Sequence, residues 1–252
     1  RAIFATVHLH TRVTRLQEDA DGVSVGLEGE GAPAEQRFDR VLVAIGREPA
    51  TQGLGLERTA VRLDAKGFIQ VDAQMCTADD RIFAIGDAVG GMMLAHKATY
   101  EGKVAADVIA GRPAAFDARA IPAVVYTDPQ IAWCGTTEDE ARRDGAAVKV
   151  LRFPWAYSGR ATTMGAAEGL TKVVAEAETG RIVGMGIVGR HTEGLIAEGV
   201  LAIEMGALAE DVAGAIHPHP TLSETQSEAA ELFLGNATHL LARRAVKAPA
   251  AG

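Results

Sequence analysis

Cysteine is scarce in this sequence, which has only Cys76 and Cys134 among its 252 residues. The two cysteines show no CxxC or metal-ligand spacing, so we interpret both as buried or incidental thiols and expect no metal site. So few cysteines also fit a reducing compartment. We therefore expect either a bacterial-type cytoplasm or the mitochondrial matrix.

An excess of positive charge and long apolar runs are lacking as well. The net charge of -8 and the isoelectric point near 5.4 argue against nucleic acid or an anionic membrane as a partner. No apolar run approaches the ~18 residues that span a bilayer, and the first residues, "RAIFATVHLH", show no signal-peptide pattern. With 48% hydrophobic and 23% charged residues, the composition is that of an ordinary globular protein of one large or two modest domains.

The first half of the chain has a pattern of short strands followed by one helix. The runs "AIFATVHL", "GVSVGLE" and "RFDRVLVAIG" are rich in β-branched residues and separated by turns, which predicts a sheet. "VRLDAKGFIQV" predicts a hairpin that turns at Asp64 to Gly67. "RIFAIGD" predicts a strand, and after it we expect a helix from about Met93 to Ile109.

The second half begins after the boundary-like stretch "RPAAFDARAIP" and mixes strands with helices. Five strands are predicted, over "AVVYT", "IAWCG", "VKVLRF", "LTKVVAEA" and "RIVGMGIVG". A short helix over "TEDEARRDG" opens with a capping box at Thr137 and Glu140. Three more helices are predicted, over Glu193–Met205, Leu208–Ile216 and Thr221–Leu234. The fold class predicted for the chain is therefore α/β.

The residues from Gly184 to Gly189 spell GxGxxG, which is the dinucleotide-binding pattern by letter. That pattern requires a strand and a tight turn that opens a helix. Here the glycines lie inside a predicted strand, and "RHTEG" separates them from the next helix. We therefore expect a structural strand at this position and no nucleotide site.

The stretch "HPHPTLSE", His217 to Glu224, allows two interpretations. Thr221 and Glu224 have capping-box spacing, so the histidines could be plain loop residues between stiff prolines. Alternatively, the carboxylate of Glu224 orients the imidazole of His219 as a base, provided that the chain turns sharply through a cis His219–Pro220 bond. A carboxylate has enough lone pairs for both tasks, so the two interpretations are compatible.

The same stretch closely resembles the H-x-H-P-T-L-x-E signature of dihydrolipoamide dehydrogenases, which belong to the pyridine nucleotide-disulfide oxidoreductases. The resemblance implies that His219 is the proton acceptor in catalysis and that Glu224 is its orienting partner. It matches His217 to a less critical histidine. Pro218 stands where the family commonly has alanine, which implies a stiffer loop.

A second motif, "AIGD…MLAHKA…EG", resembles the second flavin-binding motif of that family. By itself it predicts a strand, a tight turn and a helix N-terminus, which suit either a ligand site or a simple turn. The resemblance implies that Asp87 meets the ribityl chain of FAD. It also implies that four backbone positions lie beside the pyrimidine edge of the flavin, namely Met93, Leu94, Ala95 and His96.

Two further stretches extend the resemblance over nearly the whole chain. "RVLVAIGREPAT" resembles the end of the family's NAD domain and implies that Gly46 approaches the nicotinamide cofactor, although alone it predicts only a strand and a turn. "IPAVVYTDPQIAWCGTTEDEA" resembles the start of the interface domain, and we give Trp133 and Trp155 packing roles. The implied domains are the end of an NAD domain (1–46), an FAD-domain return segment (47–117) and a dimerisation domain with a mainly antiparallel sheet and helices (118–252).

Three parts that the chemistry requires are absent from the sequence: a strand-GxGxxG-helix unit for FAD, a second one for NAD, and a CxxxxC redox disulfide. The resemblance therefore implies a C-terminal fragment of a two-dinucleotide-fold flavoprotein. The intact enzyme would use FAD and NAD. We expect this fragment to be inactive and to bind little or no flavin.

The resemblance also implies partners. These are a second copy of the chain, forming a homodimer, and the lipoyl domains of 2-oxo acid dehydrogenase complexes or of the glycine cleavage system. Two alternatives stay open. One is another disulfide reductase of the glutathione reductase type, and the other is a dimerisation module without catalysis.

Overall fold

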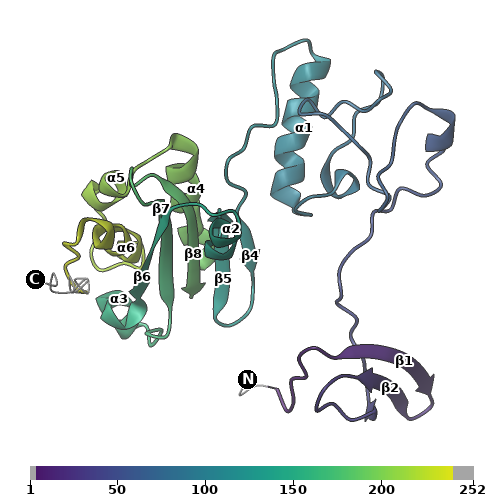
Figure 1. Cartoon of the computed structure of the whole chain (residues 1–252), viewed down its shortest axis with the longest axis horizontal. Helices are drawn as coiled ribbons and strands as arrows, with labels where there is room; N and C mark the ends of the chain where they lie inside the picture. Colours follow the sequence, from purple (N-terminus) through teal and green to yellow (C-terminus); the bar gives the residue numbers. More distant parts are fainter. Residues whose placement is uncertain (1–3, 241–252) are drawn as a thin grey trace, which may run out of the picture. The chain divides into compact units, whose positions relative to one another are not determined.

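The computed structural model describes residues 4–240, and the chain separates into two compact units, Arg1–Glu48 and Pro49–Gly252. The smaller unit holds a three-stranded antiparallel sheet in the order β1-β2-β3 (Figure 1). Its strands are β1 Arg12–Asp19, β2 Gly22–Glu28 and β3 Glu35–Phe38.

Strand β1 was not predicted, and all eight of its residues are exposed. It is held by backbone pairing with β2 and by side-chain pairs such as Arg12–Glu28, at 3.3 Å. Arg37 of β3 binds Asp19 in the same way, and its guanidinium lowers the pKa of the Asp19 carboxyl to about 2. Cross-strand pairing therefore forms a strand here without any buried side.

Of the strands predicted for the smaller unit, the one over "AIFATVHL" is wrong, and the one over "RFDRVLVAIG" is confirmed only at Arg37 and Phe38, which end β3. The described residues 4–9 of "AIFATVHL" and residues 39–46 of "RFDRVLVAIG" have no strand structure. Leu42 and Ile45 are 90% and 95% exposed. A strand needs a hydrogen-bonded neighbour, and within the described part of the chain the apolar run Val41–Ile45 has none.

The larger unit begins with irregular chain around helix α1, Ala95–Ile109, which agrees with the predicted helix. The predicted hairpin is present as a turn, in which the N–H of Gly67 donates to the carbonyl of Asp64 at 3.0 Å. Two short 3-10 turns also occur, η1 Leu56–Arg58 and η2 Gly86–Val89.

The strand predicted over "RIFAIGD" is wrong. The segment makes a single bridge between Phe83 and Cys76 and then enters η2. As in the smaller unit, the described residues supply no adjacent strand with which an apolar run could form a continuous ladder.

The C-terminal part of this unit is built on a five-stranded antiparallel sheet in the order β4-β5-β8-β7-β6. The five predicted strands are confirmed as β4 Ala123–Val125, β5 Gln130–Gly135, β6 Val148–Pro154, β7 Leu170–Glu176 and β8 Ile182–Gly189. The predicted helices are confirmed as α2 Glu138–Arg143, α4 Thr192–Met205, α5 Ala209–Gly214 and α6 Glu224–Leu234. Two short elements were not predicted, η3 Trp155–Tyr157 and α3 Gly159–Thr163.

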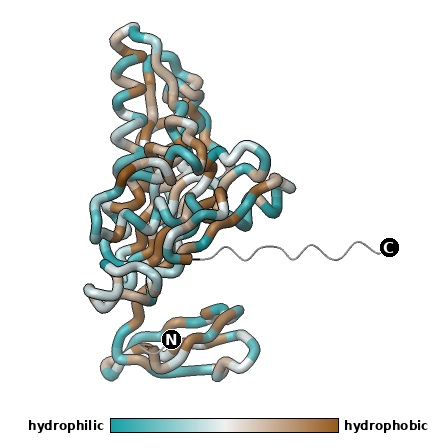
Figure 2. The backbone as a smooth tube through the Cα atoms, turned by 90° about the vertical axis from the view of Figure 1, so that its left-hand side faces the viewer, coloured by the Kyte–Doolittle hydropathy of each residue, from teal (hydrophilic) through white to brown (hydrophobic). Residues whose placement is uncertain are grey.

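The main core lies between this sheet and its helices. Helix α4 packs against β5 and β8, and α6 packs against β6 and β7 (Figure 1). Trp155 is fully buried there and donates from Nε1 to the hydroxyl of Thr171 at 2.9 Å. Hydrophobic and hydrophilic residues alternate along much of the tube in Figure 2, as expected for elements with one buried side. No helix among residues 4–240 has both the length and the apolar character needed to cross a bilayer.

The glycines of the GxGxxG pattern lie inside β8, as predicted, so they serve the packing of a strand. A Cβ atom at Gly184 would lie 1.9 Å from the carbonyl oxygen of Thr136. At Gly186, by contrast, the nearest atom would be 3.9 Å away.

This difference predicts opposite outcomes for two neighbouring substitutions. Gly184→Ala should lower the free energy of unfolding by at least about 2 kcal/mol, because the backbone of Thr136 must move. Gly186→Ala is the matched control and should change it by less than about 1 kcal/mol. Urea unfolding of both variants measures this, and equal effects would contradict the packing role of Gly184.

Candidate active site

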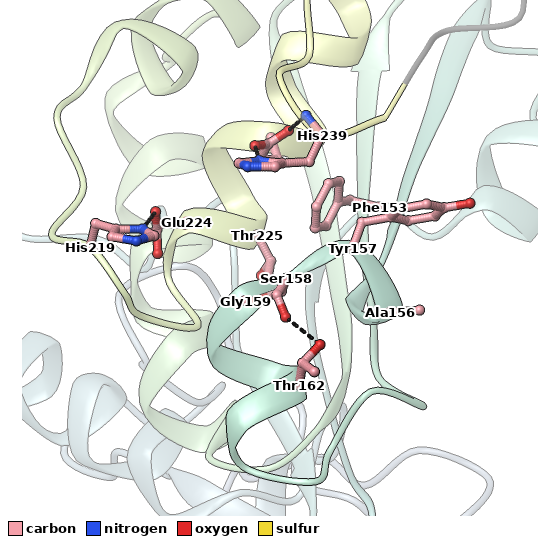
Figure 3. Close-up of a pocket in the computed structure, with 11 residues that line it drawn as sticks. Phe153, Ala156, Tyr157, Ser158, Gly159, Thr162, His219, Glu224, Thr225 and His239 are labelled. Carbon is pink, nitrogen blue, oxygen red and sulfur yellow. Dashed lines mark hydrogen bonds and ion pairs between the residues drawn. The ribbon is translucent and has the colours of Figure 1, made fainter.

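The loop between α5 and α6 carries the "HPHPTLSE" stretch. The His219–Pro220 peptide bond is cis, as predicted. The imidazole Nδ1 of His219 lies 2.8 Å from Oε1 of Glu224, the first residue of α6 (Figure 3). The structure thus brings together the two residues that the sequence analysis paired.

The second oxygen of Glu224 is also used. Oε2 accepts the backbone N–H of Thr221 at 2.7 Å, so one carboxylate both fixes the loop and meets the imidazole. The other half of the predicted capping box is wrong, because the hydroxyl of Thr221 donates to the carbonyl of Pro218 at 2.6 Å. Helix α6 begins only at Glu224, which leaves Thr221 too far before the helix to cap it.

The electrostatics determine which nitrogen of His219 can act as a base. Burial raises the pKa of Glu224, but the hydrogen bonds from Thr221 and His219 outweigh it and hold that pKa below its usual value. An ionised carboxylate only accepts hydrogen bonds, so the hydrogen-bond network assigns the proton of neutral His219 to Nδ1. Nε2 then presents its lone pair, on a side chain that is 74% exposed.

A cavity of about 320 Å³ lies beside this pair. Figure 3 shows His219 and Glu224 at one side of it, with Phe153 and Tyr157 at the other. The cavity therefore has a proton acceptor at one edge and aromatic surface opposite, an arrangement that suits a partly apolar substrate.

His217 is placed differently from His219. Its Nδ1 lies 2.9 Å from the carbonyl of Ala215 and its Nε2 lies 2.7 Å from Oε1 of Glu198 on α4. Glu198 also accepts from the amide of the buried Gln226 on α6, at 3.0 Å. Both ring nitrogens are engaged and the side chain is only 9% exposed, so His217 anchors the loop to α4, which Glu198 in turn connects to α6. Sequence analysis missed Glu198, although a glutamate within the most apolar helix is itself a signal for a polar partner.

A second histidine–glutamate pair lines the same cavity. Nδ1 of His239 binds Oε1 of Glu228, which lies one helical turn after Glu224 on α6. The backbone N–H of His239 donates to the other oxygen of Glu228 at 3.2 Å. The sequence offered no local signal for this contact, because the chain must pass the end of α6 before it returns.

The residues of the predicted flavin motif lie around the start of α1. Asp87 is in the turn η2. The four backbone positions predicted at the flavin occupy the entry to α1, in the order Met93, Leu94, Ala95 and His96. Helix α1 has neither a side-chain cap nor an acidic residue in its first turn, so its first N–H groups suit an acceptor on a ligand.

The remaining candidates belong to neither of these two groups of residues. Gly46 is in the smaller unit, with a φ of 132° and no atom within 4 Å of the place that a Cβ would occupy. Cys76 and Cys134 are free thiols, and burial raises the pKa of Cys134 to about 12, which makes it a poor nucleophile. Residues 4–240 contain no cluster of three or more histidine, cysteine, aspartate or glutamate side chains able to hold a metal.

Two family models match the chain. Residues 5–102 match pyridine nucleotide-disulphide oxidoreductase, and residues 121–230 match the dimerisation domain of pyridine nucleotide-disulphide oxidoreductase. Together the two models cover most of the sequence.

Curated relatives named dihydrolipoyl dehydrogenase are similar over nearly the whole chain. The one from Vibrio parahaemolyticus is 49% identical over 95% of this chain and 50% of its own length. The one from Thermus scotoductus is 49% identical over 94% and 52%. The chain thus spans about half the length of the curated relatives that it matches.

Solved structures agree with this likeness. LpdA from Mycobacterium tuberculosis superposes with a TM-score of 0.80 at 26% identity, over 88% of this chain and 48% of its own. The HOCl-induced flavoprotein disulfide reductase RclA from Escherichia coli gives 0.78 at 27% identity, over 88% and 50%.

The lowered pKa of Glu224 predicts how its contribution to stability changes with pH. A carboxyl whose pKa is lower in the folded state stabilises the fold above its unfolded pKa, roughly 4.3, and this stabilisation is lost as pH falls through the folded value. Glu224→Gln should therefore reduce the free energy of unfolding at pH 7 by about 1–2 kcal/mol, with the deficit shrinking below pH 4.

The measurement is urea unfolding from pH 7 to pH 3. Glu210→Gln is the matched control, because Glu210 also lies in the first turn of a helix, α5, and makes no side-chain hydrogen bond or ion pair with the described residues. A deficit for Glu224→Gln that stays constant over this pH range would show that Glu224 is not the ionised acceptor.

Proposed function

Because the chain belongs to the pyridine nucleotide-disulphide oxidoreductase family, we propose that it is the C-terminal part of a flavin-dependent dihydrolipoyl dehydrogenase. In this proposal the complete enzyme reoxidises protein-bound dihydrolipoamide with NAD. The observation that carries it is the 2.8 Å contact between His219 Nδ1 and Glu224 Oε1, which leaves Nε2 open beside a cavity.

The proposed role of His219 is to move one proton. Nε2 takes a proton from a dihydrolipoyl thiol, and the charge that develops on the imidazole is stabilised by the carboxylate of Glu224. The thiolate that remains is the form of sulfur that attacks a disulfide. The sequence has no CxxxxC, so that disulfide would come from a part of the enzyme outside this chain.

FAD and NAD are the proposed cofactors of the complete enzyme, and when bound they would carry the electron pair away from sulfur. Asp87 would accept a hydrogen bond from the ribityl chain. The uncapped N-terminus of α1 would face the electron-rich pyrimidine edge of the flavin, where its dipole stabilises negative charge. Gly46 would lie where the backbone nears the nicotinamide.

The proposed partners are a second copy of the chain and a lipoyl domain. The match of residues 121–230 to a dimerisation domain supports the homodimer, in which His219 would serve the active site of the other subunit. The exposed apolar run Val41–Ile45 supports the proposal that the rest of the enzyme supplies adjacent strands for it, because strands of this composition are buried on both faces in parallel sheets.

Substitution of His219 in the complete enzyme tests the proposed role. His219→Gln should lower dihydrolipoamide-dependent reduction of NAD by roughly 10²–10⁴-fold, because a positioned base contributes about that much, while the dimer stays intact by ultracentrifugation. His8→Gln, which changes an exposed histidine of the smaller unit, is the control and should keep full turnover. Loss of the dimer with unchanged turnover per dimer would favour a dimerisation module instead.

The isolated chain tests whether flavin binding and turnover require the rest of the proposed enzyme. It should show no flavin absorbance band after incubation with FAD, and no reduction of NAD by dihydrolipoamide, because it lacks a strand-GxGxxG-helix unit for the pyrophosphate and a redox disulfide. The complete polypeptide treated in the same way is the control. A flavin band together with turnover in the isolated chain would refute the proposal.

A further inference from the structure

A buried ion pair lies on helix α1, between two residues of the motif "AIGD…MLAHKA…EG" that have been given no role so far. Nζ of Lys97 contacts Oε1 of Glu101 one helical turn later, and the two side chains are only 8% and 4% exposed. The pair Arg112–Asp107 at the far end of the same helix is instead largely exposed. Lys97 and Glu101 are therefore exceptional in that both charges are withdrawn from water.

Each partner makes a second bond, and both bonds end on the same turn. Oε2 of Glu101 accepts the N–H of Gly86 at 2.7 Å. Nζ of Lys97 donates to the carbonyl of Gly90 at 3.1 Å. Gly86 and Gly90 enclose Asp87, so the ion pair grips both ends of the turn that carries it.

Stability does not explain why two charges are buried here. Withdrawing an ion pair from water costs several kcal/mol per ion, and apolar residues of similar volume are often at least as stable. What the ion pair adds is a fixed backbone conformation for the turn. Gly86 and Gly90 have φ values of 74° and 78°, and glycine moves easily among such conformations unless neighbouring groups fix it.

We propose that Lys97 and Glu101 are positioning residues, which form a clamp that holds the turn Gly86–Gly90 in the shape required to receive the polyol chain of a flavin. The inference rests on the proposed function for the identity of the ligand. The clamp itself rests on three contacts: the Lys97–Glu101 ion pair, the Glu101–Gly86 hydrogen bond and the Lys97–Gly90 hydrogen bond.

The test replaces the pair by apolar residues of similar length, Lys97→Met with Glu101→Leu, in the complete enzyme. The unfolding midpoint should fall only slightly, because the loss of the hydrogen bonds to Gly86 and Gly90 is offset by the removal of two buried charges. The FAD dissociation rate should rise about tenfold. In the isolated chain, hydrogen exchange at the amide of Gly90 should also rise about tenfold. That amide donates to the carbonyl of Asp87 at 3.3 Å and touches neither substituted side chain, so it reports the shape of the turn.

Two further variants serve as controls. Asp107→Asn with Arg112→Gln removes the exposed pair from the same helix and should change neither rate. Lys97→Arg keeps the charge and should preserve most of the slow FAD dissociation.

The possible outcomes test the clamp and the proposed function separately. Unchanged exchange at Gly90 in the double variant overturns the clamp. A double variant that fails to fold overturns it as well, because the pair would then support the helix and not the turn. If the unmodified complete enzyme binds no FAD, the proposed function fails, while the exchange measurement still decides the clamp.

Discussion

The candidate site depends on the two oxygens of one carboxylate. Glu224 holds the N–H of Thr221 with one oxygen and the imidazole of His219 with the other. Because Glu224 begins α6, and α6 packs against β6 and β7, the position of an exposed ring is set by the buried core. A surface histidine would otherwise exchange among several rotamers. The fold thus supplies what the proposed acid–base role requires, an imidazole in one orientation.

The parts of this arrangement that could be predicted are those whose partners lie close together in the sequence. The capping box of Thr137 and Glu140 needs only four residues, and both of its hydrogen bonds are present. The His219–Glu224 contact spans five positions, so its spacing and the intervening proline contain most of the information. Helices α4 to α6 and the strands of the five-stranded sheet follow in the same way from local periodicity and turn residues.

Features with distant partners could not be predicted, because packing decides them. The apolar run Val41–Ile45 has the composition of a strand but no hydrogen-bonded neighbour among the described residues, whereas β1 has a neighbour and no buried side. The contact of His217 with Glu198 joins α4 to the loop before α6. Lys97 and Glu101 have the spacing of a helical ion pair, but the sequence does not show that each of them also bonds to one end of the turn Gly86–Gly90. In each case the residue types are visible in the sequence, whereas their arrangement in space is not.

A carboxylate partner does not by itself identify a catalytic imidazole in this chain, because three histidines near the cavity or its loop have one. The pairs are His217–Glu198, His219–Glu224 and His239–Glu228. His217 is buried with both ring nitrogens engaged, so it cannot exchange a proton with a substrate without breaking the loop anchor. The placement of His239 depends on the segment that follows α6, whereas His219 lies in a loop closed by the Thr221–Pro218 and Thr221–Glu224 hydrogen bonds. Of these three histidines, only His219 combines a backbone fixed on both sides with a ring nitrogen that has no hydrogen-bond partner among the described residues. This combination is the reason for proposing His219, and not His217 or His239, as the base.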